Sequence, residues 1–149
     1  MNQTKIQKEF VDLGFGFPVR LRQVPMVKVR GVWTPQVNYE QLAQAALKAL
    51  CFKPVRLTGN EVRFIRLQLE MTLEEFAARF CVTHPSVIKW EKQGDEPTKM
   101  QWCTEKDIRL YLLLQIEGEE RFVDLYKKLE PIQSARKWTN SIDVNTLAA

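Results

Sequence analysis

Apolar residues recur three and four positions apart in three short stretches between residues 58 and 97. This spacing places them on one side of a helix, so each stretch predicts a helix with one buried stripe. The three stripes are Val62, Ile65 and Leu69, then Phe76, Ala77 and Phe80, then Val87 and Trp90. The second helix is expected to end near Phe80 and the third to begin at Thr83, with a short turn between them.

Each stretch also opens with a signal for the start of a helix. Two threonine–glutamate pairs have the spacing of a capping box, Thr58 with Glu61 and Thr72 with Glu75. Thr83 can cap the third helix, whose first turn contains Pro85. Gly94 and Pro97 then end that helix. Two capped helices joined by a turn of about three to four residues have the layout of a helix-turn-helix.

The segments Leu57–Arg66, Met71–Ala77 and Val82–Glu91 resemble the phage repressor/Cro-like (Xre-type) helix-turn-helix family of DNA-binding proteins. The resemblance implies a lambda-repressor-like helical DNA-binding domain. Its third helix would lie in the major groove of DNA, with the first turn of the helix against the edges of the bases.

The resemblance places candidate DNA contacts on the third helix and at the start of the second. These candidates are Thr72, Leu73, Thr83, His84, Pro85, Ser86, Lys89 and Lys92. Lys89 is the best candidate base reader, because lysine donates to guanine O6 and N7, and the Ser86 hydroxyl can reach a phosphate. The family often has glutamine where this chain has Leu73 and Pro85, so two usual amide contacts with DNA are absent.

Alternative interpretations stay open for this block. The internal ion pair of the family would fall on Arg66 and Glu91, and its role would be structural. The three helices can also be read as a compact core with no DNA role. His84 and Lys89 can each be read as solvated surface side chains.

Positive charge is concentrated in the N-terminal third of the chain. Residues 1–57 contain nine basic and three acidic side chains, whereas residues 58–100 contain six basic and seven acidic ones. The helix-turn-helix block is therefore slightly acidic, although the chain of 149 residues has a net charge of +4. This balance and the missing glutamines favour a protein-interaction role, whereas the spacing, the caps and Lys89 favour DNA binding.

Apolar and basic residues alternate in Val19–Arg22 and in Val27–Arg30, which predicts a β-hairpin with a break at Gln23–Pro25. Its outer face would carry secondary contact residues, namely Arg20, Arg22, Lys28 and Arg30. Three roles stay open for this face. It can contact DNA phosphates, contact an acidic protein surface, or simply keep a sheet edge soluble.

A helix is expected from about Tyr39 to Leu50, and Pro54 then breaks the chain. Residues 1–56 are therefore expected to form an N-terminal α+β segment. The stretch Val24–Gly31, followed by a repressor-like domain, is similar to two-part antitoxins of the MqsA kind, in which a zinc-binding N-terminal domain binds a ribonuclease toxin. The zinc site does not carry over, because the three cysteines lack C-x-x-C spacing and His84 is the only histidine. The similarity implies a toxin protein as partner, with no metal or other cofactor.

Two further amphipathic helices are expected beyond Pro97. Their apolar residues are Trp102, Ile108, Tyr111, Leu112 and Leu113 in the first, and Phe122, Leu125, Tyr126 and Leu129 in the second. These helices either form the seam of a homodimer, with two readers about one DNA turn apart, or cover the helix-turn-helix core. The helix-turn-helix domain is thus expected to span residues 57–131, and residues 132–149 to be a loose tail.

The expected fold is mainly α, a lambda-repressor-like domain with a small N-terminal β-hairpin plus helix and C-terminal helices. No apolar run is long enough to span a membrane, and the odd number of cysteines fits a reducing cytoplasm. No enzyme is expected, because Cys81 and His84, the only conceivable nucleophile and base, lack a third orienting group.

Two functions follow from these patterns. The first is a sequence-specific transcriptional regulator that binds double-stranded operator DNA as a homodimer, in the manner of an antitoxin-like autorepressor of a toxin-antitoxin system. The alternative is a protein-interaction module that uses the helix-turn-helix scaffold and the basic hairpin without binding DNA specifically.

Overall fold

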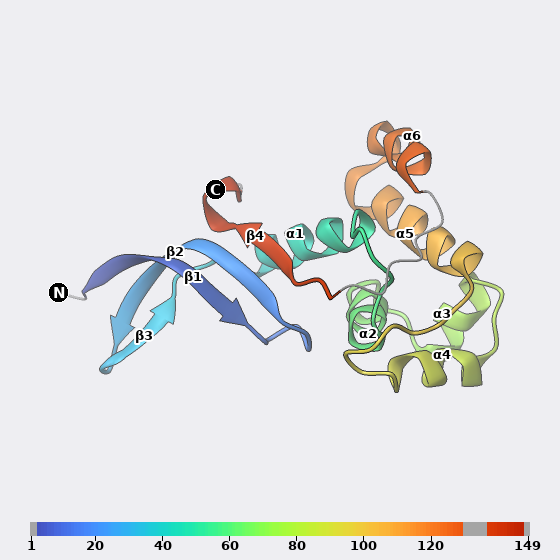
Figure 1. Ribbon diagram of the computed structural model, residues 1–149, viewed down its shortest axis with the longest axis horizontal. Helices are drawn as coiled ribbons and strands as arrows, with labels where there is room; N and C mark the ends of the chain where they lie inside the picture. The colour runs from blue at the N-terminus through green and yellow to red at the C-terminus, as the bar shows by residue number, and fades with distance from the viewer. Residues whose placement is uncertain (1–2, 130–136, 148–149) are drawn as a thin grey trace. The chain divides into compact units, whose positions relative to one another are not determined.

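Strands and one long helix make up the first of two units into which the chain divides. Figure 1 shows the computed structural model, which describes residues 3–129 and 137–147. The first unit consists of residues 1–49 and 139–149, and the second of residues 50–138. The elements of the first unit are β1 (Thr4–Asp12), β2 (Val19–Val29), β3 (Val32–Pro35), β4 (Asn140–Asp143), a short 3-10 turn (Val144–Thr146) and nearly all of α1 (Tyr39–Cys51).

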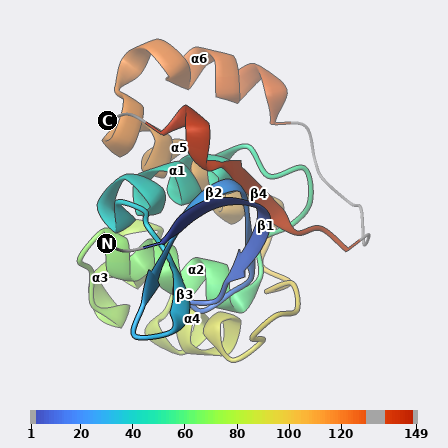
Figure 2. The same cartoon turned by 90° about the vertical axis from the view of Figure 1, so that its left-hand side faces the viewer.

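The central strand of the sheet is β2. It pairs with β1 in antiparallel fashion from Val19 to Val27. Its other edge is shared by β3, antiparallel to Met26–Val29, and β4, parallel to Val19–Arg22. Figure 1 and Figure 2 show β4 running beside β2. The buried side chains of this unit come mainly from β2 and α1, namely Val19, Leu21, Val24, Met26, Leu42, Ala46 and Leu47.

The prediction of a mainly α, lambda-repressor-like fold is wrong. The described residues form a four-stranded mixed sheet as well as six α-helices. Two strands carry the difference. β1 has too many exposed apolar and charged residues to show a clear alternating pattern. β4 follows β2 by more than a hundred residues, and such a distant pairing leaves no local signal in the sequence.

The structure has no hairpin turn at Gln23–Pro25, because β2 runs through this segment. Gln23 has a φ of 56°, and the buried positions change phase there, from Val19 and Leu21 to Val24 and Met26. The actual turn between β2 and β3 is the two-residue loop Arg30–Gly31, where both residues have positive φ, as a type I′ hairpin turn requires.

The four basic residues predicted to share an outer face are therefore not arranged as expected. Arg20 and Arg22 are exposed before the change of phase. Lys28 lies in phase with buried Met26, and its Nζ is 5.8 Å from the centre of the Trp33 ring. Arg30 lies in the turn. Only Arg20 and Arg22 can act together.

The C-terminal region also differs from the expected loose tail. Residues 140–143 form β4, in which Asn140 and Ile142 are buried. The predicted tail began at residue 132, and the parts of it at 132–136 and 148–149 lie outside the described residues. The structured part of this tail belongs to the sheet because its short apolar alternation pairs with β2.

The second unit is helical. Its elements are α2 (Gly59–Gln68), α3 (Leu73–Arg79), α4 (His84–Glu91), α5 (Trp102–Glu117) and α6 (Glu119–Lys128). Both predicted capping boxes are present, and Thr83 caps α4 by accepting from the Ser86 N–H. α5 packs against α6, and their buried side chains Ile108, Leu112, Leu113, Leu125 and Leu129 contribute to the core of this unit.

Buried charges hold the segment that precedes α2. Arg109 on α5 donates to the carbonyl oxygens of Lys53 (2.5 Å) and Val55 (2.6 Å), and to Glu105 Oε2 at 2.7 Å. The Glu105 Oε1 accepts from Arg56 Nε at 2.8 Å. All the partners of Glu105 and Arg109 lie on this one connection, so α5 fixes where α2 begins.

Candidate nucleic-acid interface

The turn between α3 and α4 is built by backbone hydrogen bonds. Phe80 ends α3, and Cys81 follows with a φ of 58°. The Val82 N–H then donates to the Ala77 carbonyl at 3.0 Å, which closes the end of α3. Thr83 begins α4 directly after this closure. The predicted helix-turn-helix layout of these residues is confirmed at the level of the backbone.

The packing of α2 against α4 depends on a glycine. A Cβ at Gly59 would meet the backbone oxygen of Trp90 and would come within 2.8 Å of the Gly94 N. The first turn of α2 therefore touches the end of α4 backbone to backbone. The Asn60 N–H donates to the Gly94 carbonyl at 2.9 Å and strengthens this contact.

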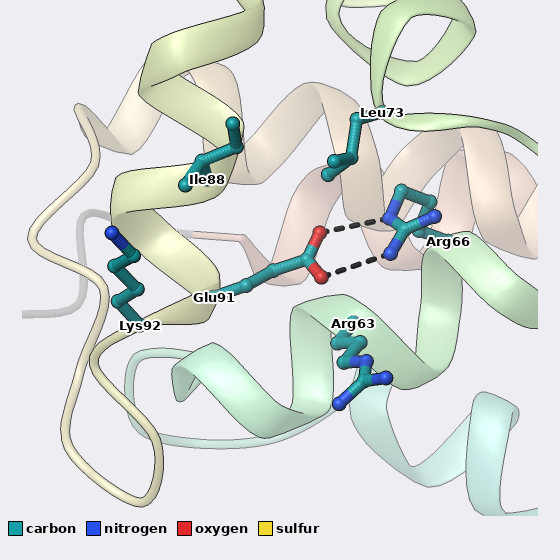
Figure 3. Close-up of a pocket in the computed structure, with 6 residues that line it drawn as sticks. All are labelled: Arg63, Arg66, Leu73, Ile88, Glu91 and Lys92. Carbon is teal, nitrogen blue, oxygen red and sulfur yellow. Dashed lines mark hydrogen bonds and ion pairs between the residues drawn. The ribbon is translucent and has the colours of Figure 1, made fainter.

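An ion pair fixes the same two helices from the other side. Arg66 on α2 donates from Nε to Glu91 Oε2 at 2.8 Å and from Nη2 to Glu91 Oε1 at 3.0 Å. Its third nitrogen, Nη1, donates to the Met71 carbonyl at 3.0 Å. The arginine thus joins α2, the entry to α3 and the end of α4, as expected for a structural pair. Figure 3 shows the two parallel hydrogen bonds.

The outward side of α4 carries the residues proposed as DNA contacts. Pro85, Lys89 and Lys92 are exposed, and Lys89 is the only one of them in the middle of the helix. His84 is half-buried, with its Nδ1 4.0 Å from Glu74 Oε1 on α3. The Ser86 hydroxyl lies 2.8 Å from the Thr83 hydroxyl. Ser86 is therefore engaged with the cap, and Lys89 is the freest polar group of α4.

A hollow of about 350 Å³ lies between α2, α3 and α4. It is lined by Arg63, Arg66, Leu73, Ile88, Glu91 and Lys92. Figure 3 shows the Arg66–Glu91 pair between the apolar side chains of Leu73 and Ile88 on one side and Arg63 on the other. Because Arg66 and Glu91 neutralise each other, Arg63 and Lys92 supply the net positive charge of the hollow.

Two residues of this hollow were missed by sequence reasoning. Arg63 is exposed on α2, three positions before Arg66, so helical spacing puts both arginines on neighbouring positions of one face. Ile88 is a half-buried apolar residue next to Lys89. The signal for Arg63 was present in the i, i+3 spacing, whereas nothing in the sequence marked Ile88 as outward-facing.

The arrangement suits an anionic, grooved partner. Arg63, Lys89 and Lys92 are cationic and solvent-exposed, and the candidate positions Thr72 and Leu73 lie at the start of α3. Lysine and arginine on a rigid frame can bind phosphate oxygens, and a lysine in the major groove can donate to guanine. The nearest acidic group on this side, Glu74, faces His84.

Other kinds of site were searched for in the same structure. Within residues 3–129 and 137–147, no three His, Cys, Asp or Glu side chains come together in a way that could hold a metal ion. None of the described helices is long and apolar enough to cross a membrane. No protein-family model matches the chain, and no curated protein or solved structure is significantly similar to it.

Proposed function

We propose that the chain is a sequence-specific DNA-binding transcriptional regulator that places α4 in the major groove. The observation that supports this most is the capped pair of α3 and α4, held on its inner side by Arg66 and Glu91 and carrying exposed Lys89 on its outer side. A recognition helix needs this combination, because its contacts must be held rigidly while its polar side chains remain available to bases.

Each cation of the interface has a distinct role in this proposal. Lys89 donates to the acceptor atoms of a guanine, which supplies sequence preference. Arg63 and Lys92 lie at the rim of the hollow and bind phosphates on either side of the groove, which supplies affinity without sequence information. Leu73 and Ile88 offer apolar surface to the sugar edge or to a thymine methyl group.

The regulator is proposed to act as a homodimer on an operator with two half-sites. A single recognition helix contacts few base pairs, and two-fold symmetry doubles the length of sequence that is read. An antitoxin-like autorepressor would add a second partner, a toxin protein bound by the sheet unit while α4 binds the operator.

The test is binding of the full chain to the DNA upstream of its own gene, compared with a scrambled duplex, at salt concentrations from about 50 to 200 mM. We expect a preference for the native duplex that persists at the upper end of this range. Lys127→Ala, on the exposed side of α6, is the matched control for loss of one positive charge. Equal and weak binding to both duplexes, lost as salt rises, would rule the regulator out.

A second candidate is a protein-interaction module without specific DNA binding. The observation that favours it is the pair Arg20 and Arg22, which are both exposed on the sheet, in a unit separate from the helices. Two adjacent arginines fit an acidic protein surface. In the salt series, this candidate predicts no preference between the duplexes, and charge removal at Arg20 and Arg22 would leave DNA binding unchanged.

A further inference from the structure

The first strand of the sheet has an open edge. β1 is nine residues long and pairs with β2 along one side only. On its other side, no strand lies within the part of the chain that the structure describes. An unpaired edge of this length exposes a row of N–H and C=O groups that can pair with another strand, and proteins usually cover or shorten such edges.

Backbone geometry shows which residues present their peptide groups to this edge. Ile6 lies opposite Pro25 of β2, and the Pro25 carbonyl accepts from the Gln36 N–H at 2.7 Å, on the β3 side. Residues opposite each other in an antiparallel pair either bond to each other or both point away. Since Pro25 has no N–H and points away from β1, Ile6 directs its N–H and C=O to the open edge.

The edge is also apolar at two symmetrical points. The side chain of Ile6 is 69% exposed and that of Val11 is 54% exposed. Between them lie Lys8 and Glu9, which are exposed and of opposite charge. The order of residue types from Ile6 to Val11 is therefore apolar, basic, acidic, apolar, and it reads as its own complement when the strand is reversed.

We infer that β1 is a homodimer interface at which two copies of the chain join edge to edge in antiparallel register. A two-fold axis between Lys8 and Glu9 places Lys8 of one copy opposite Glu9 of the other, and Ile6 opposite Val11. A shift of the axis onto Lys8 or onto Glu9 would put like charges directly opposite each other, which is unfavourable. The charge pattern therefore selects one register and favours a second copy over an unrelated strand.

This interface differs from a seam formed by α6, and the inference does not depend on DNA binding. Sedimentation velocity of the full chain without DNA, over a range of micromolar concentrations, measures the dimer directly. We expect Lys8→Glu and Glu9→Lys each to raise the dimer dissociation constant by about tenfold, because each places two pairs of like charges across the axis. The double variant, in which the two charges are exchanged, should restore the wild-type value.

A second variant tests the backbone of the edge. Ile6→Pro removes an N–H that points away from β2, so it should abolish the dimer while the sheet within one copy keeps its circular dichroism and melting temperature. Lys127→Glu on α6 is the charge control and should leave the dimer unchanged. A wild-type chain that stays monomeric would overturn the inference. So would a dimer insensitive to both the charge variants and Ile6→Pro, or one disrupted by Tyr126→Glu on α6.

Discussion

The guanidinium of Arg66 and the carboxylate of Glu91 face each other through two parallel hydrogen bonds of 2.8 and 3.0 Å. Both side chains are largely buried, with 11% of each exposed. Such a bidentate pair fixes orientation as well as distance. It therefore sets the angle of α4 relative to α2, which determines the direction in which Lys89 points.

We predict that Glu91→Gln destabilises the chain by about 3 kcal/mol, because it leaves a largely buried arginine charge without its partner. The double variant with Arg66→Met and Glu91→Leu should lose less than the sum of the two single losses. Urea unfolding followed by circular dichroism measures these differences. Gln68→Ala, at an exposed position of α2, is the control. Strictly additive losses would show that the pair is not coupled.

The helical unit was the more predictable part because its signals are local. Thr58 and Thr72 each bond a residue three positions away, and the apolar stripes repeat within a few turns. The Arg66–Glu91 pair could be expected only from the resemblance. Within the site, Lys89 was found by its position on α4, whereas Ile88 was missed because an apolar residue is normally assigned to the core.

The sheet unit was less predictable because it depends on contacts between distant residues. The pairing of β4 with β2 has no local signature. The change of phase at Gln23 depends on a positive φ that glutamine rarely adopts, so the sequence on either side was read as two strands. Arg109 and Glu105 were not assigned to the core, because charged residues are seldom fully buried unless they are paired.

We predict that Gly59→Ala destabilises the helical unit by about 1–3 kcal/mol, because the added methyl group overlaps the backbone at the end of α4. Without this contact alanine would be favoured over glycine in a helix, so the sign of the effect is informative. Thermal unfolding of the variant measures it. An unchanged or raised melting temperature would mean that α2 and α4 are further apart than in the structure.

We predict that Arg109→Met costs about 3–5 kcal/mol of stability, because it leaves Glu105 with one cation and removes the hydrogen bonds to the Lys53 and Val55 carbonyls. Arg109→Lys should not restore stability, since an ammonium cannot donate to both carbonyls and the carboxylate in the same planar geometry. Urea unfolding of both variants provides the measurement, with Lys127→Met as control. Full rescue by lysine would indicate that only the charge matters.

We predict that the three cysteines differ in reactivity. Burial raises the pKa of the Cys51 thiol from 9.0 to about 12, and the nearby Arg109 charge offsets this only in part. Cys81 and Cys103 are exposed. A thiol reagent at pH 8 should therefore modify these two in the folded chain and Cys51 only after unfolding. Modification of all three at one rate in the folded state would contradict the buried position of Cys51.

The same shift makes stability depend on alkaline pH. A raised pKa means that the folded state favours the neutral thiol. The contribution of Cys51 is then fully present below pH 9 and is lost as the pH rises toward 12. We expect the free energy of unfolding to fall more steeply between about pH 9 and 11 for the wild type than for Cys51→Ala. Parallel slopes would show that another group governs the alkaline transition.

We predict that Lys89→Ala weakens binding to the preferred duplex by about tenfold or more and relaxes the preference at one base pair. Arg63→Ala should instead weaken binding to preferred and scrambled duplexes alike and reduce the salt dependence, because Arg63 lies at the rim of the hollow and is expected to contact phosphate. Fluorescence anisotropy with a set of singly substituted duplexes separates the two effects. If Lys89→Ala weakened every duplex by the same factor, Lys89 would be a phosphate contact, and base recognition would have to come from another residue of α4.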